Sequence, residues 1–245
     1  MKNRKITSKS TEKIPSYVSI YNMLYSDIVN GLYKDGTQLP SETSLTKKYG
    51  VSRHTLRQAL TVLSEDGLII KSQGKSTLIS YRKEKIHTAD KVVNNPIVQC
   101  SKDEIDAIDI SYNYGPPTEV AQEKLNINAS EIIMASNNVY FVNNKPVGHS
   151  FIQIPVKHIN NLNVNLNFED QVSDLINKKI FELGYSARIH FKLIFAEENI
   201  TQFLQVDLNT PIIFMEEIIY NKNSEGIARC KFYFLPDKYE INLNI

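Results

Sequence analysis

The first third of the chain carries apolar positions at helical spacing, separated by residues that start and stop helices. Between Ser52 and Gly67 an apolar stripe with this spacing predicts an amphipathic helix. The stripe consists of Leu56, Ala59, Leu60 and Leu63. A shorter helix precedes it, because Ser41 can cap a first turn and Gly50 tolerates the left-handed backbone where that helix must end. Ser52 can cap the second helix in the same way, so the pattern predicts a helix-turn-helix.

Two further elements flank this motif. An apolar face from Pro15 to about Asn30 predicts a helix that packs under the other two. Its inward positions are Val18, Ile20, Tyr21, Leu24, Tyr25 and Ile28. Beyond Gly67, two β-prone segments on either side of Gln73-Gly74-Lys75-Ser76 predict a small hairpin that would form a wing.

The second helix of the motif has a surface suited to DNA. Arg53 and Arg57 are four residues apart and lie on one flank, while Ser52, His54 and Thr55 belong to the first turn. In helix-turn-helix proteins these N-terminal positions meet base edges in the major groove, where the planar guanidinium of arginine matches guanine. The alternative is an ordinary solvated helix face, with His54 as a plain surface residue.

Four segments of this region resemble the winged-helix domain of GntR-type bacterial transcription regulators. They read Leu-Pro-Ser-Glu, Gly-Val-Ser-Arg-x-Thr-Leu-Arg-x-Ala-Leu, Leu-x-x-Asp-Gly-Leu-Ile and Gln-Gly-Lys, and they span roughly Tyr17 to Ile79. Thr43 departs from the family, which often has arginine there, and the wing reads Gly74-Lys-Ser-Thr77 in place of Gly-x-Gly-Thr. The resemblance implies base or phosphate contacts by Ser52, Arg53, Thr55 and Arg57, with Gly74 and its neighbours in the minor groove. The full set of candidate DNA-binding residues is Ser41, Thr43, Ser52, Arg53, His54, Thr55, Arg57, Gln73, Gly74 and Lys75.

The remainder of the chain alternates strand-like and helical patterns. Strands are expected over residues 131–142, 147–154, 187–196, 212–221 and 227–235, and helices over 118–125, 171–183 and 199–206. The first two of these strands are separated by the turn Asn143-Asn144-Lys145, and the last two by residues 221–226. Hairpin-connected strands with inserted helices predict an antiparallel sheet of the α+β class.

This second part resembles the UTRA effector-binding domain of the HutC branch of the same family, whose fold is like chorismate lyase. The anchors are the turn that leads from Asn144 to Pro146, the helix stop Leu183-Gly184, and the segment from Lys231 to Tyr239. The resemblance implies a winged helix-turn-helix domain (15–80) and a UTRA-like effector-binding and dimerisation domain (96–245). The polar, lysine-rich residues 1–14 predict a disordered basic tail, and the polar residues 81–95, which lack a clear period, predict a linker.

Charge separates the two parts in the way that a DNA-binding protein requires. The chain has 245 residues and a net charge of +1, but residues 1–85 carry 15 basic and 7 acidic side chains. The remaining residues are acidic overall and would be repelled by DNA. There is no apolar run long enough to span a membrane and no signal peptide, and the two cysteines, Cys100 and Cys230, have no metal spacing. We therefore expect a cytoplasmic protein.

A catalytic site is not evident, and we expect neither an enzyme nor a cofactor. The chain lacks a Walker loop, a Gly-x-Ser-x-Gly motif and a His-Glu-x-x-His motif. The adjacent carboxylates Glu197-Glu198 and Glu216-Glu217 are expected to point in different directions and to lie on solvated faces. His149 and His190 stand alone on strands, which favours structural or surface histidines over ligands.

We therefore expect a ligand-responsive repressor that binds a palindromic operator as a homodimer. Two alternatives remain open: a winged-helix replication or partition protein without a ligand, and an enzyme on a chorismate-lyase-like domain. An effector-domain cavity would disfavour the first alternative, while the second needs a convergent acid, base and arginine set.

The resemblance also indicates what the effector is not. Relatives that bind sugar phosphates use two arginines and an acid, which fall here at Asn138, Tyr140 and Ser150. Further pocket positions fall near Gln171, Ser173, Ala228 and Phe234, and Arg229 is a nearby cation whose direction the sequence does not assign. Because a buried dianion without a counter-charge is costly, we expect a neutral or weakly charged, partly apolar ligand in place of a phosphosugar. Alternatively, these are ordinary strand residues, or the pocket has lost its ligand.

Overall fold

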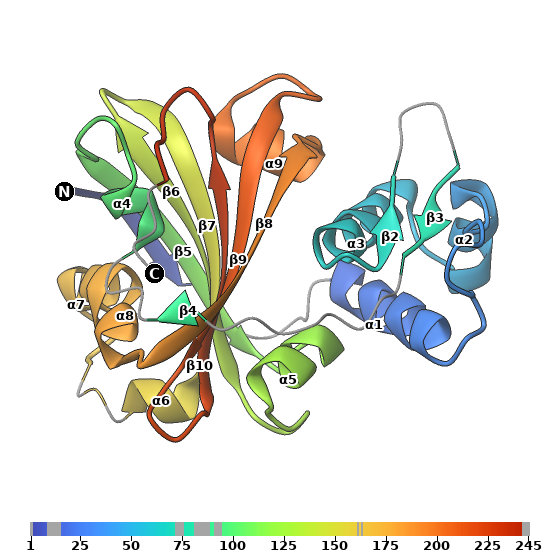
Figure 1. Cartoon of the computed structure of the whole chain (residues 1–245), viewed down its shortest axis with the longest axis horizontal. Coiled ribbons are helices and arrows are strands. Elements are labelled where there is room, and N and C mark those ends of the chain that lie inside the picture. The colour runs from blue at the N-terminus through green and yellow to red at the C-terminus, as the bar shows by residue number, and fades with distance from the viewer. Residues whose placement is uncertain are drawn as a thin grey trace. The chain divides into compact units, whose positions relative to one another are not determined.

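The structure is a computed structural model that describes residues 2–8, 16–71, 76–80, 89–90, 95–160, 162 and 164–241. The chain divides into two compact units (Figure 1). One unit comprises Glu12–Lys85 with Thr118–Val120, and the other comprises Met1–Thr11, Ile86–Pro117 and Ala121–Ile245. Each unit is described below by itself.

The smaller unit is a winged helix-turn-helix, as the sequence predicts. Its elements are α1 (Ser16–Val29), α2 (Glu42–Tyr49), α3 (Arg53–Glu65), β2 (Ile69–Ile70) and β3 (Leu78–Ile79). Ser41 and Ser52 cap α2 and α3, where each hydroxyl accepts a hydrogen bond from a backbone amide. Gly50 adopts the left-handed backbone that ends α2. Strands β2 and β3 pair in antiparallel fashion and form the base of the wing.

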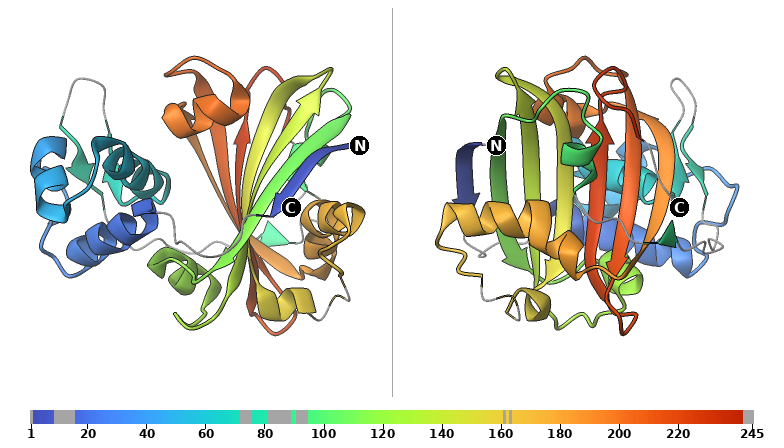
Figure 2. Two further views of the ribbon diagram at one scale, coloured as in Figure 1. Left: turned by 180° about the vertical axis from the view of Figure 1, so that it is seen from behind. Right: turned by 60° about the vertical axis from the view of Figure 1, so that its left-hand side comes forward.

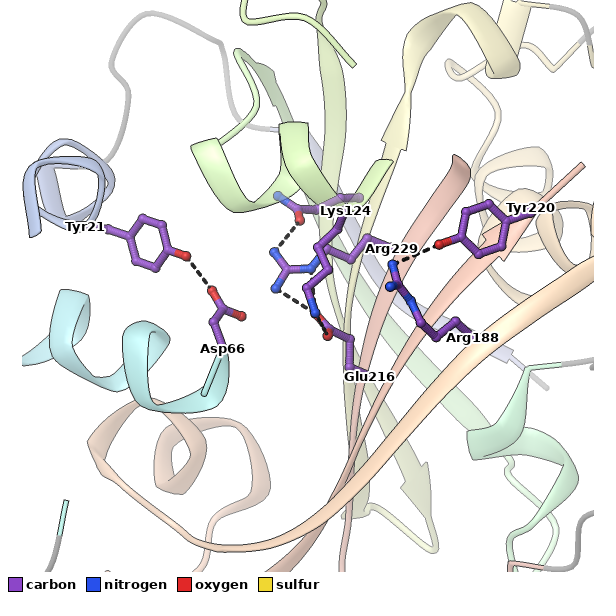
Figure 3. Close-up of polar contacts among 8 residues, drawn as sticks. Tyr21, Asp66, Lys124, Arg188, Glu216, Tyr220 and Arg229 are labelled. Atoms are coloured by element: carbon purple, nitrogen blue, oxygen red, sulfur yellow. Dashed lines mark hydrogen bonds and ion pairs between the residues drawn. The ribbon is translucent and has the colours of Figure 1, made fainter. Parts of the chain in front are cut away.

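A single apolar core holds the three helices together. It consists of Ile20, Tyr21, Leu24, Tyr25, Ile28, Leu39, Leu45, Leu56, Ala59, Leu60, Leu63, Leu68, Ile69, Ile79 and Val120. Two polar contacts fix the helices further: the hydroxyl of Tyr21 donates to Asp66 at 2.7 Å (Figure 3), and Lys48 Nζ lies 2.7 Å from Asp27. Helix α3, which bears the candidate DNA-binding residues, is therefore anchored at both its core face and its C-terminal end.

The larger unit is built on one eight-stranded sheet in the order β1-β5-β6-β7-β10-β9-β8-β4. Only the β1–β5 pair is parallel, and all other neighbours are antiparallel. The strands are β1 (Lys2–Ser8), β4 (Ala89–Asp90), β5 (Ala107–Gly115), β6 (Ile133–Val142), β7 (Lys145–Pro155), β8 (Ser186–Phe195), β9 (Pro211–Tyr220) and β10 (Gly226–Phe234). The helical segments are α4 (Pro96–Gln99), α5 (Glu119–Leu125), α6 (Val156–Asn160), α7 (Glu169–Asp174), η1 (Leu175–Lys179), α8 (Ile180–Leu183) and α9 (Glu198–Leu204).

The two faces of this sheet are covered by different helices. The continuous helix α7–η1–α8 lies across one face, whereas α5 and α9 lie against the other (Figures 1 and 2). Phe181 of α8 packs on Phe232 of β10, and Gly184 approaches Ile219 of β9 so closely that a Cβ there would collide with it. We call the face beneath α7–η1–α8 the helix-covered face, and it holds the main apolar core.

The hairpins follow the predicted turns. Asn143 and Asn144 both have positive φ, which suits the two-residue turn between β6 and β7 because asparagine tolerates this conformation better than most residues. Residues 221–225 connect β9 and β10, as expected. The class is therefore α+β with a mainly antiparallel sheet.

Several features differ from the sequence expectations. In place of a disordered tail, Lys2–Ser8 form β1 beside β5, because the outer edge of β5 offers backbone groups that a passing chain can pair with. Most of the expected linker over residues 81–95 lies outside the described residues, but Ala89–Asp90 form β4 beside β8. The pattern did not predict β5 or α6, and the helix expected over 171–183 contains the wider turn η1.

Candidate DNA-binding surface and effector site

The start of α3 presents the side chains that the sequence assigns to DNA. Ser52, Arg53, His54 and Arg57 are exposed, and Thr55 is partly exposed. The amide of Thr55 donates to Ser52 Oγ at 3.1 Å, which completes the N-terminal cap of the helix. The positive end of the helix and Arg53 therefore lie together on the solvent side of the unit, where a phosphate or a base edge can reach them.

The start of α2 lies beside the same surface. Arg57 Nε donates to Glu42 Oε2 at 3.0 Å, and both side chains remain about half exposed. Ser41 and Thr43, on either side of Glu42, are also exposed. The structure thus brings the α2 and α3 candidates together, and Glu42 enters the site as a residue that the sequence analysis did not select. The wing candidates Gln73, Gly74 and Lys75 lie outside the described residues.

Three effector candidates meet on the helix-covered face of the sheet. Asn138 of β6 stands directly opposite Ser150 of β7, and its Nδ2 donates to Ser150 Oγ at 3.0 Å. The hydroxyls of Tyr140 and Ser150 are 3.2 Å apart. All three side chains are fully buried, and burial raises the pKa of Tyr140. We call these three residues the polar cluster.

Two asparagines that the sequence analysis missed extend the polar cluster. Asn95 Nδ2 donates to the hydroxyl of Tyr140 at 2.8 Å and to Asn177 Oδ1 at 3.0 Å. Asn177 Oδ1 also accepts from Tyr140 at 3.1 Å. Asn95 could have been found, since asparagine before Pro96 is typical of a helix start. Asn177 could not, because its position depends on the wide turn η1, a feature that often marks functional sites.

The other helix-side candidates are joined to the polar cluster to different degrees. Ser173 accepts from Asn177 Nδ2 through its carbonyl oxygen at 2.9 Å, so it supports the polar cluster indirectly. Gln171 instead accepts from the amide of Asn165 at 2.7 Å and stabilises the loop before α7. Phe234 is buried on the same face and packs against Tyr239, so it belongs to the apolar surroundings.

Arg229 is not part of this cluster. It points to the opposite face of the sheet, where its Nε donates to Glu216 Oε1 at 2.7 Å and its Nη1 donates to Gln153 Oε1 at 3.3 Å (Figure 3). Lys124 of α5 lies 3.0 Å from the other oxygen of Glu216. Neighbouring residues of a strand face opposite ways, so Arg229 cannot share a face with Ala228, and its selection as an effector residue does not fit this geometry.

The adjacent acids Glu216 and Glu217 point to opposite faces, as expected, but neither is solvated. Glu216 belongs to the ion-pair network just described, whereas Glu217 lies on the helix-covered face between Met215 and Ile219. Neither carboxylate oxygen of Glu217 has a hydrogen-bond partner among the described residues, and burial raises the pKa of this side chain to about 8. The expectation of solvated carboxylates is therefore wrong for this pair, because the burial of Glu217 depends on tertiary packing that the strand pattern does not reveal.

The histidines are structural or exposed. His149 is buried on the face opposite the polar cluster and stacks on Phe203 of α9, with ring centroids 4.1 Å apart. Burial lowers its pKa to about 3, so the ring is neutral at physiological pH. His190 is exposed on β8. Among the residues that the structure describes, no group of three or more metal-binding side chains comes together, and no helix is long and apolar enough to cross a membrane.

Comparison with known protein families agrees with this division. Residues 16–79 match the family model described as bacterial regulatory proteins, gntR family. Residues 103–240 match the UTRA domain. The two matches coincide with the winged helix-turn-helix and with most of the strands of the large sheet.

Individual proteins are similar over most of the chain. YurK of Bacillus subtilis, an uncharacterised helix-turn-helix transcriptional regulator, is 19% identical over 94% of this chain and 95% of its own. The transcriptional repressor NagR of the same organism is 24% identical over 92% of this chain and 93% of its own. Among solved structures, a GntR-family regulator from Enterococcus faecalis covers 56% of this chain and 99% of its own, with 15% identity and a TM-score of 0.50.

Proposed function

The chain belongs to the gntR family of bacterial regulatory proteins and carries a UTRA domain, and from this premise we propose that it represses transcription under the control of a small molecule. It is a DNA-binding transcriptional regulator; repression, the effector class, the homodimer and the HutC branch are parts of the proposal. A cytoplasmic location and the absence of catalysis belong to it as well. Residues 15–80 would bind DNA, and residues 96–245 would bind the effector and the second subunit.

The observation that carries the DNA-binding role is the exposed, capped start of α3. Arg53 and Arg57 share this surface with Ser41 and Thr43 of α2. One short helix reads few bases, so a symmetric pair of such helices on a palindromic site is needed for selectivity.

A DNA-binding experiment tests this role. We expect Arg53→Ala and Arg57→Ala each to weaken binding to a site selected from a random pool by about 1–3 kcal/mol, with specificity relaxed locally. Lys75→Ala should weaken selected and scrambled duplexes more evenly, because a phosphate contact carries no sequence information. Gel shifts at physiological salt provide the measurement. Unchanged affinity of Arg57→Ala for both duplexes would contradict the assignment of α3.

The polar cluster supports an effector other than a sugar phosphate. Within the described residues, the hydrogen-bonding groups gathered here are hydroxyls and amides of Asn95, Asn138, Tyr140, Ser150 and Asn177. Arg229, the cation that the sequence placed nearby, is engaged on the other face. A buried phosphate needs charge-assisted partners that this cluster does not supply. Thermal-shift screening tests the point: stabilisation by a phosphosugar that is lost in Tyr140→Ala would contradict it.

An exposed apolar strip on β8 supports a dimer formed by the larger unit. Phe191, Leu193 and Phe195 point to one face of this strand and are 39%, 63% and 57% exposed. Within the described residues, β4 pairs with β8 only at Ser186 and Ala187. An apolar strand near the sheet edge can meet the same strand of a second copy around a twofold axis.

Sedimentation of a fragment that ends near Arg82, and so lacks β8, tests the proposed dimer. We expect this fragment to be a monomer that binds DNA poorly, and tight dimerisation of the fragment would contradict the proposal.

A further inference from the structure

The helix-covered face contains an acid that the polar cluster does not use. Glu217 of β9 has no exposed surface, and in the part of the chain that the structure describes neither of its carboxylate oxygens has a hydrogen-bond partner. Its neighbours across the sheet are Cys230 on β10 and Ile189 on β8. An unpaired polar group in an apolar layer is costly, so its presence calls for a compensating role.

The position of Glu217 connects it to the polar cluster. Cys230 of β10 pairs with Glu217 of β9 on one side and with Ile152 of β7 on the other. Ile152 is two residues from Ser150, so both side chains point to the same face of the sheet. The same continuous helix covers this row of side chains, with Asn177 above Tyr140 and Gly184 against Ile219. Glu217 and the polar cluster therefore occupy one layer between sheet and helix.

A second atom in this layer is also unpaired. Asn138 Oδ1 is buried and no described residue donates a hydrogen bond to it, although Nδ2 of the same side chain donates to Ser136 and Ser150. Once Glu217 has lost its proton, its carboxylate oxygens and this amide oxygen are all acceptors. A molecule that satisfied them would have to donate hydrogen bonds, and a cation would satisfy the carboxylate best.

We propose that the effector is a small organic amine whose ammonium group binds Glu217, while a neutral polar end of the same molecule reaches the polar cluster. The proposal rests on the proposed function, because it names the ligand class of the same domain. Phe181, Phe232 and Phe234 lie on the same face and provide apolar surroundings for the carbon skeleton. On the opposite face of the sheet, the buried acid Glu216 already forms ion pairs with Lys124 and Arg229, so it does not need a cationic ligand.

Matched pairs of compounds test the class of ligand. Each pair differs only in an amino or a hydroxyl group: putrescine and 1,4-butanediol, tyramine and tyrosol, glucosamine and glucose. Calorimetric titration of the full chain should show saturable binding for at least one amine and at least tenfold weaker binding for its alcohol. The proposal would be overturned if each amine that binds has an alcohol counterpart of equal affinity. It would also be overturned if none of the amines binds.

Two variants test the residue. Glu217→Gln keeps the shape of the side chain but removes the charge, and it should weaken the bound amine at least tenfold while leaving the alcohol unchanged. Glu182→Gln, an exposed glutamate on α8, is the matched control and should bind like the unmodified chain. Amine binding that survives Glu217→Gln would overturn the assignment, and circular dichroism of each variant confirms that the fold is retained.

Selection of DNA from a random pool separates failure of this inference from failure of the proposed function. If the chain selects a palindromic site but binds no amine, the proposed regulatory function stands and only the proposed ligand class is wrong. If the chain binds an amine through Glu217 but selects no DNA, the inference about Glu217 stands and the proposed repressor function is wrong.

Discussion

At the scale of single residues, Glu42 holds one of the two arginines expected to read DNA. Its carboxylate accepts from Arg57 at 3.0 Å, yet an exposed ion pair of this kind contributes little to stability. Its effect on DNA binding should be larger, because the carboxylate both orients Arg57 and repels phosphate. A positioned guanidinium discriminates between bases better than a free one.

We therefore predict that Glu42→Gln strengthens binding to scrambled DNA and lowers the ratio of selected to scrambled affinity. The measurement is a gel shift with both duplexes at two salt concentrations. Glu65→Gln, at the other end of α3, serves as the control, since it removes the same charge away from the α2–α3 surface. A specificity ratio that falls equally in both variants would show that only net charge matters.

A second residue, Glu217, should make stability depend on pH. Burial raises its pKa to about 8, whereas an unfolded glutamate titrates near 4.5. Between these values the folded chain keeps a proton that the unfolded chain has released, so stability falls as pH rises, by up to about 1.4 kcal/mol per pH unit.

Glu217→Gln should remove this dependence and be more stable than the unmodified chain at pH 8, with little difference at pH 4.5. Denaturant unfolding at intervals from pH 4.5 to 8 measures the effect, with Glu182→Gln as the control. Parallel curves for the two variants would mean that Glu217 is ionised in the folded chain.

At the scale of elements, the sequence predicts what depends on local pattern and misses what depends on tertiary contacts. The caps Ser41 and Ser52 and the paired asparagines of the β6–β7 turn act within a few residues, so the sequence identifies them. Strand β5 was missed, although it packs at the centre of the β1-β5-β6 region, because no hairpin turn joins it to its neighbour.

The candidate effector site shows the same limit. Asn138, Tyr140 and Ser150 were identified through the resemblance, and their spacing on paired strands brings them together. The partners Asn95 and Asn177 come from segments 45 and 37 residues from Tyr140 along the chain, and no local pattern links them to it. The unexpected burial of Glu217 belongs here too, since helix α7–η1–α8 covers it only in the folded chain.

The wide turn η1 leads to a prediction about its length. A π-turn has the geometry of one residue inserted into an α-helix, and here it aims Asn177 at Tyr140 while Ile180 stays in the core. Deletion of the exposed Lys178 should restore a regular helix and rotate one of these two side chains away from the sheet.

We expect this deletion to cost at least about 1–3 kcal/mol, the usual loss for a buried polar group left unpaired. Lys178→Ala, which keeps the chain length, should be nearly neutral. Urea unfolding of both variants provides the comparison, and equal stability of the two would mean that η1 does not determine the position of Asn177.

At the scale of the whole molecule, the exposed strip on β8 should decide whether two copies associate. Leu193→Asp places a charge at the centre of the strip, where it would be buried in the proposed dimer. We expect this variant to sediment as a monomer and to lose affinity for a palindromic duplex, while its helix and strand content is retained.

Ile132→Asp is the matched control, because Ile132 is 47% exposed just before β6, a strand that three others separate from β8 in the sheet. It should remain dimeric and bind DNA normally. A dimer that survives Leu193→Asp would remove β8 from the interface and leave the subunit contacts to another surface.

The pairing of β1 with β5 also affects the outcome of limited proteolysis. Because Lys2–Ser8 pair with β5 in the larger unit, the winged helix-turn-helix is an insertion with a covalent attachment on each side. A protease that cleaved once between residues 81 and 88 would produce an amino-terminal fragment still held by its first strand. We expect the two fragments to co-elute in size-exclusion chromatography in native buffer and to elute separately in denaturant. A purification tag fused before Lys2 would likewise lie next to the sheet that carries the polar cluster, so the tag should be removed before any ligand titration.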